Sequence, residues 1–162
     1  MPLPVFILLL TRLFWEPYWI PSGSMNPPLL PNDYIAVVPV GDVVARGDVL
    51  VVAHPTRGQN FVVRLIGLPG EQIQLRDGNI YINDIPVSSD PAGPYVELME
   101  PQGTLGLLPR CSNGAVGMGE ICEKAMYTEL LPEGIAYDVL DIDGGRLDNT
   151  GVYTVPTGHY FM

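Results

Sequence analysis

The sequence predicts a mainly β fold, and three observations lead to that prediction. Apolar residues occur in short runs rich in β-branched side chains, and Gly, Pro or Asp bounds each run. The chain contains 18 Gly and 17 Pro, yet 47% of it is hydrophobic, so turns explain these residues better than disorder does. No run has the spacing of an amphipathic helix. A chain of 162 residues suits one core-bearing domain, with room for an insertion.

The first segment, residues 1–20, is expected to associate with a membrane. Val5 to Leu10 is an unbroken apolar run, but spanning a bilayer takes about 20 such residues. Arg12 follows the run and no small-residue cleavage site is present, which argues against a cleaved signal peptide. Aromatic residues of the kind found at lipid headgroups come next: Phe14, Trp15, Tyr18 and Trp19. We interpret residues 1–20 as a truncated anchor or interfacial segment; the alternative is that these aromatics pack in the domain's own core.

The residues after this segment are predicted to form short strands and one tight hairpin. The strand-like runs are Tyr34 to Val38, Val49 to Ala53 and Phe61 to Ile66. The hairpin is predicted where Gln72 to Leu75 and Asn79 to Ile82 flank Asp77-Gly78, because this residue pair suits the positive φ angles of a two-residue turn.

The composition changes near residue 90, which predicts an inserted subdomain. From there to about residue 140, Gly and Pro are scattered, both cysteines occur, and strands are hard to place; the β pattern resumes at Val152 to Val155. We therefore predict a β core made of residues 21–90 and 141–162, with an inserted β subdomain at residues 91–140.

Charge and composition exclude several partners and cofactors. The net charge is −10, and the eight Lys and Arg residues do not cluster, so a nucleic-acid partner is not expected. Cys111 and Cys122 match no metal pattern; a disulfide across their Gly-rich loop and two unrelated thiols are both open interpretations. His54 and His159 lie far apart and are interpreted as structural or surface residues. We expect no metal and no cofactor.

Possible chemistry first appears at Ile20-Pro21-Ser22-Gly23-Ser24-Met25. A serine after a glycine turn can be held exposed, with backbone N–H groups nearby to bind an oxyanion. Most Ser-Gly-Ser turns only cap a turn, so this motif alone would favour a structural role.

Other segments of the chain favour a functional role for this motif, because together with it they form an ordered series of motifs. These are Ile20 to Leu30, Arg46-Gly47-Asp48-Val49, and Arg64-Leu65-Ile66-Gly67-Leu68-Pro69-Gly70-Glu71. In order and approximate spacing they resemble three signature boxes of bacterial type I signal peptidase. Asp77 to Asn83 is similar to the hairpin after the third box, and Leu147 to Thr150 through Pro156 to Phe161 is similar to the approach to the last. The resemblance runs from about residue 12 to the end of the chain.

This resemblance implies a function and a set of site residues. Ser24 would be the nucleophile that attacks the peptide bond after a signal sequence, and Ser22 with the Ser24 N–H would face the oxyanion. The partners would be signal peptides of exported preproteins and membrane lipid. The implied location is the bacterial cytoplasmic membrane, with a β-rich catalytic core and its inserted β domain on the outer, periplasmic face.

The sequence departs from the family at the general base. The family uses a Ser-Lys dyad, and its lysine should immediately precede Arg64, where this chain has Val63. The only lysine is Lys124, which lies in the predicted insertion and is expected to be a solvated surface residue. The histidine of the related endoplasmic-reticulum enzymes is not available either, because His54 falls on another predicted strand.

Two further departures concern the ends of the chain. After Phe161-Met162 the family would continue with a Gly-Asp-Asn motif and a serine that orients the lysine, and the N-terminus has too few residues for the family's anchor helix. These differences suggest an incomplete or degenerate gene product as much as a new role.

Two hypotheses follow. The first is a signal peptidase I, a membrane-associated serine endopeptidase, impaired because Val63 replaces the lysine. The alternative is a non-catalytic paralogue or gene fragment that keeps a groove for an extended signal peptide. A self-cleaving repressor, which also needs a Ser-Lys dyad, fits less well because such proteins are soluble. All of these depend on one spatial expectation: the strand with Val63 should run alongside the Ser24 turn.

Overall fold

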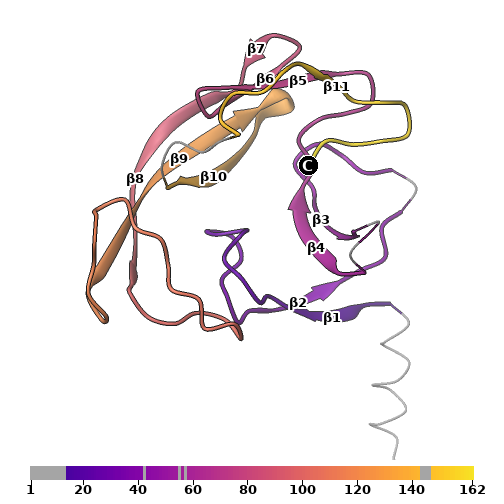
Figure 1. Cartoon of the computed structure of the whole chain (residues 1–162). Coiled ribbons are helices and arrows are strands. Elements are labelled where there is room, and N and C mark those ends of the chain that lie inside the picture. The colour runs from indigo at the N-terminus through magenta and orange to yellow at the C-terminus, as the bar shows by residue number, and fades with distance from the viewer. Residues whose placement is uncertain (1–13, 42, 55, 57, 143–146) are drawn as a thin grey trace, which may run out of the picture.

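The computed structural model describes residues 14–162 except 42, 55, 57 and 143–146. Its elements are almost all strands, which confirms the mainly β prediction (Figure 1). In chain order they are β1 (Glu16–Trp19), β2 (Tyr34–Val37), β3 (Val49–Ala53), β4 (Asn60–Arg64), β5 (Gln72–Arg76), β6 (Asn79–Ile82), β7 (Ile85–Pro86), β8 (Ser88–Leu98), β9 (Ile121–Leu131), the 3-10 turn η1 (Pro132–Gly134), β10 (Ile135–Asp141) and β11 (Tyr153–Thr154).

The strands form small antiparallel sheets rather than one continuous sheet. Two sheets are simple pairs, β1 with β2 and β3 with β4. A third sheet has the order β11-β5-β6-β7, so the last strand of the chain returns to the predicted hairpin. The fourth has the order β10-β9-β8. Most strands therefore pair with a strand that is next to them in sequence, whereas β11 pairs with β5, which is far from it in sequence.

The strands predicted in the first half agree with the structure, apart from shifts of one or two residues at several boundaries. β3 has the predicted bounds, and Asp77 (φ 48°) and Gly78 (φ 79°) form the predicted turn. β4 begins one residue earlier than predicted and ends at Arg64. It ends there because the next two N–H groups bond outside the β3–β4 ladder: Leu65 donates to Asp48 O and Ile66 to Phe161 O, both at 2.9 Å.

Residues 16–19 form a strand that the sequence analysis did not predict. β1 pairs with β2, and the Trp19 and Tyr34 rings stack with their centroids 6.3 Å apart. The apolar run Val5 to Leu10 and Arg12 lie outside the described residues. Within residues 14–162, apart from the gaps given above, no helix has the length and apolar character needed to cross a bilayer.

Residues 88–141 form the longest strands of the described chain. β8 and β9 have 11 residues each, and β10 pairs with β9 over Ile135–Asp141. The pattern of β8 is obscured by Pro91, Gly93 and Pro94, with a register shift between Pro91 and Gly93. Proline is tolerated because β8 is the edge strand, where a missing N–H breaks no interior ladder. We call this sheet the insertion sheet, and residues 99–120, which join β8 to β9, its tip.

The main buried cluster joins the insertion sheet to the β11-β5-β6-β7 sheet. Its members are apolar residues from both parts of the chain: Ile66, Ile73, Ile82, Val87, Leu131 and Val155. Ile135 and Tyr137 of β10 pack against it. Residues from the ranges predicted as the β core, 21–90 and 141–162, thus share one apolar cluster with the end of the insertion sheet near the β9–β10 turn, which fixes that end of the sheet.

A buried arginine reinforces the same junction. Arg46 is 5% exposed, and its guanidinium pairs with Glu71 at 2.7 Å and with Glu133 of the β9–β10 turn at 2.8 Å. It also donates to Ile66 O at 2.5 Å. The hydrogen bonds from Arg46 lower the pKa of the Glu71 carboxyl below its ordinary value. The second and third sequence boxes are therefore tied to each other and to the insertion by one cation.

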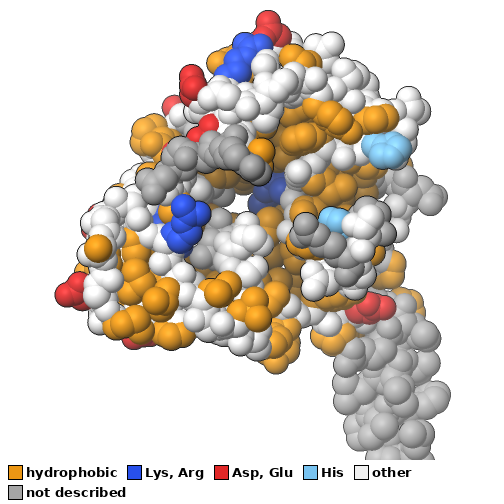
Figure 2. All heavy atoms as spheres, in the orientation of Figure 1, with side chains coloured by type: hydrophobic (Ala, Val, Ile, Leu, Met, Phe, Trp, Pro, Cys, Tyr) orange, Lys and Arg blue, Asp and Glu red, His pale blue; other side chains and the backbone are white. Residues whose placement is uncertain are grey.

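The tip is closed by a disulfide between Cys111 and Cys122, so of the two open interpretations the structure shows the bridged one. Figure 2 shows hydrophobic side chains along the lower edge of the molecule in this view. Large apolar side chains that are exposed in and near the tip include Leu98, Leu105, Leu107, Leu108, Met118 and Ile121. The tip thus combines a covalent clamp with an apolar outer surface.

Candidate active site

The two predicted site serines lie on the segment between β1 and β2, which we call the serine turn (residues 20–33). Its neck is closed by backbone hydrogen bonds from Ile20 N to Asp33 O at 2.9 Å and from Asn32 N to Ile20 O at 2.8 Å. Ile20 is 3% exposed and anchors the neck in the protein. In Figure 1 the turn rises into the space between β3–β4 and the insertion sheet.

Within the turn, Ser24 is exposed and Ser22 is half-buried, with their Oγ atoms 3.5 Å apart. Gly23 allows this arrangement because a Cβ there would lie 3.2 Å from the Asn26 side chain. Among the described residues, the Ser24 N–H donates no hydrogen bond. An exposed hydroxyl, a neighbouring hydroxyl and a free N–H are groups from which an oxyanion site can be built.

Val63 is the next-to-last residue of β4 and pairs with Leu50 of β3. The next residue, Arg64, points to the other face, where it donates to Gly47 O at 2.8 Å and lies over the Tyr137 ring at 4.5 Å. Arg64 thus joins β4 to β10. The strand that carries Val63 is thereby held on one side by β3 and on the other by the insertion sheet.

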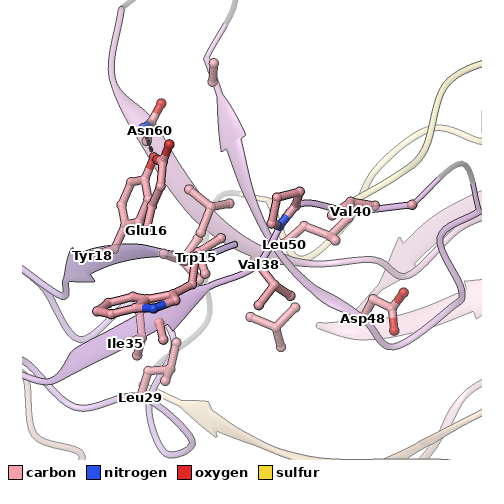
Figure 3. A pocket seen from close by; sticks show the side chains of 18 of the residues that line it. Trp15, Glu16, Tyr18, Leu29, Ile35, Val38, Val40, Asp48, Leu50 and Asn60 are labelled. Carbon is pink, nitrogen blue, oxygen red and sulfur yellow. Dashed lines mark hydrogen bonds between the residues drawn. The ribbon is translucent and has the colours of Figure 1, made fainter. Parts of the chain in front are cut away.

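A groove of about 1030 Å³ separates the β1–β2 pair from the β3–β4 pair (Figure 3). One wall includes Tyr18, Leu29 and Ile35, which come from the serine turn and the strands on either side of it. The other includes Leu50, the partner of Val63, and Val62, its neighbour. Asn60 Nδ2 donates to the Tyr18 hydroxyl at 3.1 Å across the groove, as the dashed line in Figure 3 shows.

The groove is open and its lining is mostly apolar, which suits an extended peptide segment with apolar side chains. Of its lining residues, Leu29 belongs to the serine turn, and Asn60 and Val62 belong to β4. The described residues that line it do not include Ser22, Ser24 or Val63, and the alternation of β4 turns Val63 to the face opposite Val62. The sequence analysis named no substrate-binding residues, so this wall was missed. The alternation of Asn60 and Val62 on one face of β4 was the available signal, but it did not show which sheet faced that side.

The prediction that Lys124 is a solvated surface residue was wrong. Its side chain is 7% exposed, and its Nζ contacts Glu97 Oε1, whose side chain is 11% exposed. The reason is the alternation of β9, which turns Cys122 and Lys124 to the buried face of the insertion sheet. The Lys124 ammonium is therefore paired with the Glu97 carboxylate inside the insertion sheet.

The histidines have local partners. The His54 ring packs on Phe61 at 5.3 Å and contacts Thr56, and His159 Nδ1 lies 3.2 Å from Thr157 O. Both contacts are between near neighbours or within one hairpin, as expected for structural or surface residues. In the parts of the chain that the structure describes, no three His, Cys, Asp or Glu side chains gather in a way that could hold a metal.

Comparison of this chain with known proteins identifies its family. The family model described as "Signal peptidase, peptidase S26" matches residues 1–162. This chain belongs to the signal peptidase family S26. The family resemblance inferred from the sequence boxes is thereby confirmed, and the β-rich core agrees with it.

Curated relatives bear the same family name. The signal peptidase I of Rickettsia typhi is 32% identical over an alignment that covers 96% of this chain and 62% of the relative. The signal peptidase I of Pseudomonas aeruginosa is 30% identical, with 98% of this chain and 54% of the relative covered. This chain therefore spans between half and two thirds of the length of these relatives.

Proposed function

We propose that this chain is a signal peptidase I of impaired activity, which binds signal peptides of exported proteins in the groove between β1–β2 and β3–β4. The observation that carries the proposal is the match of the signal peptidase family to the whole chain. The groove supports it, because Leu29 on one wall and Val62 on the other belong to the segments that carry Ser24 and Val63, although Ser24 and Val63 themselves do not line it.

In this proposal Ser24 is the nucleophile. Its exposed hydroxyl would attack the scissile carbonyl, and the oxyanion would be met by the Ser22 hydroxyl and the Ser24 N–H. The substrate would lie extended along the groove, where β4 offers backbone groups and shallow apolar pockets for alternate side chains. No metal or cofactor takes part in this scheme.

The step that this chain performs poorly is removal of the serine proton. Val63 stands where the family resemblance puts the general-base lysine, and an alkyl side chain cannot accept a proton. Lys124 does not replace it, because its ammonium is engaged with Glu97 inside the insertion sheet. Loss of a catalytic base lowers turnover by up to about 10⁶-fold, roughly 8 kcal/mol of transition-state stabilisation.

We also propose that the insertion sheet is the inserted subdomain predicted at residues 91–140. Residues 1–20 then serve as the membrane-associated segment, with the domain on the outer face of the cytoplasmic membrane. Support for the lipid contact comes from Phe14, Trp19 and Tyr34, which are large aromatic side chains with substantial exposure.

Because Val63 cannot act as a general base, a second candidate function is a protein that binds signal peptides without hydrolysing them. Both candidates use the same groove, so they differ only in turnover. If binding is the whole function, wild type would retain a labelled signal peptide intact. Any cleavage by wild type that Ser24→Ala abolishes would eliminate this candidate.

The experiment compares wild type, Ser24→Ala, Val63→Lys and Ile85→Lys for cleavage and binding of a labelled signal-peptide substrate. We expect Val63→Lys to cleave about 10²- to 10⁴-fold faster than wild type, the contribution of a positioned base. Ile85→Lys adds the same charge at an exposed site on β7 and should change nothing. If Val63→Lys folds and binds the peptide but cleaves no faster than Ile85→Lys, the assigned mechanism is wrong.

A further inference from the structure

The tip of the insertion sheet contacts the serine turn directly. Gln102 and Leu107 form a small hairpin through backbone bonds of 2.9 and 3.1 Å. At its bend, Gly103 lies so close to the serine turn that a Cβ there would be 2.2 Å from the carbonyl oxygen of Pro21. Pro21 immediately precedes Ser22. The backbone of the tip is therefore packed on the peptide unit that leads into the Ser-Gly-Ser motif.

A chain of buried polar contacts holds this hairpin in place. Gln102 Nε2 donates to Glu97 Oε2 at 2.6 Å, and the other carboxylate oxygen of Glu97 contacts Lys124 Nζ. The Lys124 ammonium also lies 5.9 Å from the centre of the Tyr95 ring. Burying such an ion pair is costly unless further hydrogen bonds satisfy it, and Gln102 supplies one of these. The pair thereby fixes the first residue of the hairpin.

The serine turn has few restraints of its own near the motif. The bonds between Ile20, Asn32 and Asp33 close its neck, and the bond from Asn26 N to Gly23 O, at 3.1 Å, follows the motif. The other bonds inside the turn lie beyond the motif, from Leu29 N to Met25 O and between Leu30 and Asp33. The contact with Gly103 lies between the neck bonds and the bond from Asn26 to Gly23. It is thus well placed to determine the position and orientation of the peptide units that carry Ser22 and Ser24.

We propose that Lys124, Glu97, Gln102 and Gly103 are positioning residues for the serine turn. The Lys124–Glu97 pair holds the Gln102 side chain, and Gln102 begins the hairpin with Leu107. Gly103, at the bend of this hairpin, packs against Pro21. The insertion then has a role in the site although none of its four residues reaches the reacting atoms. The catalytic part of this inference rests on the proposed function; the structural part does not.

The hairpin contains a matched control for the steric contact. Gly103 (φ 63°) and Gly106 (φ 58°) have nearly the same backbone conformation, so alanine causes similar backbone strain at either position. At Gly106, however, the nearest atom to the new Cβ is Pro101 Cβ at 3.9 Å, an ordinary contact. Comparing Gly103→Ala with Gly106→Ala therefore isolates the contact with Pro21 from the strain in the hairpin.

The readout is amide hydrogen exchange of the wild-type, Gly103→Ala and Gly106→Ala chains, followed by NMR at Asn26 and Asn32. We expect exchange at these amides to be about tenfold faster in Gly103→Ala than in Gly106→Ala, equal to about 1.4 kcal/mol of local stability. Equal exchange in the two variants would overturn the proposal. Should Gly103→Ala fail to fold, Gln102→Ala decides, because it removes only the hydrogen bond to Glu97; unchanged exchange there also overturns it.

A kinetic readout separates positioning from substrate binding. In the Val63→Lys background, Gly103→Ala should lower kcat about tenfold more than Gly106→Ala does, with KM similar in both, because the groove walls are untouched. An equal effect on kcat, or an effect confined to KM, would contradict a positioning role. If Val63→Lys is itself inactive, the proposed function fails, and the hydrogen-exchange comparison still decides the positioning claim.

Discussion

The insertion sheet meets the rest of the chain at two ends, and these ends are built differently. At the β9–β10 end, Leu131 and Ile135 join the main apolar cluster, and Glu133 pairs with the buried Arg46. At the tip, the contact is between backbone atoms of Gly103 and Pro21, steadied from within the insertion by Lys124. The first end buries apolar area and charge; the second is a close approach of the Gly103 backbone to Pro21, with Pro31 also nearby.

This difference suggests a division of labour. Apolar burial is the main favourable term in the unfolding free energy, and removing one partner of a buried ion pair is strongly destabilising, so changes at the β9–β10 end should have the larger effect on global stability. A close backbone approach buries little, but it can restrict the Ser-Gly-Ser motif, which has few hydrogen bonds of its own. The tip should therefore affect the geometry of the serine turn and leave global stability nearly unchanged.

The largest expected effect is at the β9–β10 end. Arg46→Met should lower the unfolding free energy by about 4 kcal/mol, because it leaves the Glu71 carboxylate and the Ile66 carbonyl without their buried partner. Urea denaturation measures this change. Arg76→Met is the matched control: Arg76 pairs with Asp84 at the surface, with side chains 42% and 76% exposed, so it should cost less than about 1 kcal/mol. Equal losses would contradict the importance of Arg46.

An intermediate effect is expected from Glu129, which lies on β9 and is 7% exposed. Burial raises the pKa of its carboxyl above the ordinary 4.5, against the effect of the hydrogen bond from the Tyr137 hydroxyl at 2.5 Å. The folded state thus binds this proton more tightly than the unfolded chain. The resulting stability is complete below about pH 4.5 and is lost as pH rises through the folded-state pKa.

Glu129→Gln cannot ionise, so it should be more stable than wild type at pH 7, by about 1 kcal/mol, and lose this advantage below about pH 4.5. Glu71→Gln gives the opposite trend, because the lowered pKa of Glu71 makes its contribution appear above about pH 4.5 and disappear as pH falls through the folded-state value. Thermal unfolding of both variants from pH 3.5 to 8 checks the two signs. Parallel pH curves for the two variants would contradict the burial and pairing described for these carboxylates.

The smallest effect on global stability is expected at the tip. Gln102→Ala should change the unfolding free energy by no more than about 0.5 kcal/mol, because Gln102 is only partly buried and the Lys124–Glu97 contact remains. Urea denaturation of this variant beside Arg46→Met compares the two ends directly. A loss of similar size in both would mean that the tip, too, carries global stability, and the proposed division would be wrong.

The sequence predicted the parts of the fold where a run of β-branched residues is bounded by clear turn residues. β3 and the Asp77-Gly78 hairpin follow from β-branched runs and from residues that accept positive φ. β8 was not placed, because Pro91 and Pro94 hid an edge strand, and β1 was not placed, because its aromatics also fit a membrane surface. In both cases the deciding fact was the neighbouring strand, which local sequence does not contain.

Local sequence named candidate site residues but did not indicate the arrangement around them. Family boxes identified Ser24 and Val63, and those roles stay predictions. The groove walls and the contact between Gly103 and Pro21 depend on segments far apart in sequence, so no local pattern indicated them. Lys124 shows the same limitation: a lone lysine among Gly-rich segments suggested solvent, whereas the register of β9 with β8 brings it to Glu97 on the buried face.

The central claim is that Val63 on β4 lies beside the serine turn, so that an amine at this position would reach the Ser24 hydroxyl. A direct test is cross-linking of Ser24→Cys/Val63→Cys with a short bis-maleimide, followed by peptide mapping. The control is Ser24→Cys/Ile85→Cys, with its second cysteine on β7. We predict efficient linkage of residues 24 and 63 and little linkage of residues 24 and 85. Equal linkage in the two pairs, or no linkage of residues 24 and 63, would contradict both the proposed site and the proposal that Val63 impairs catalysis.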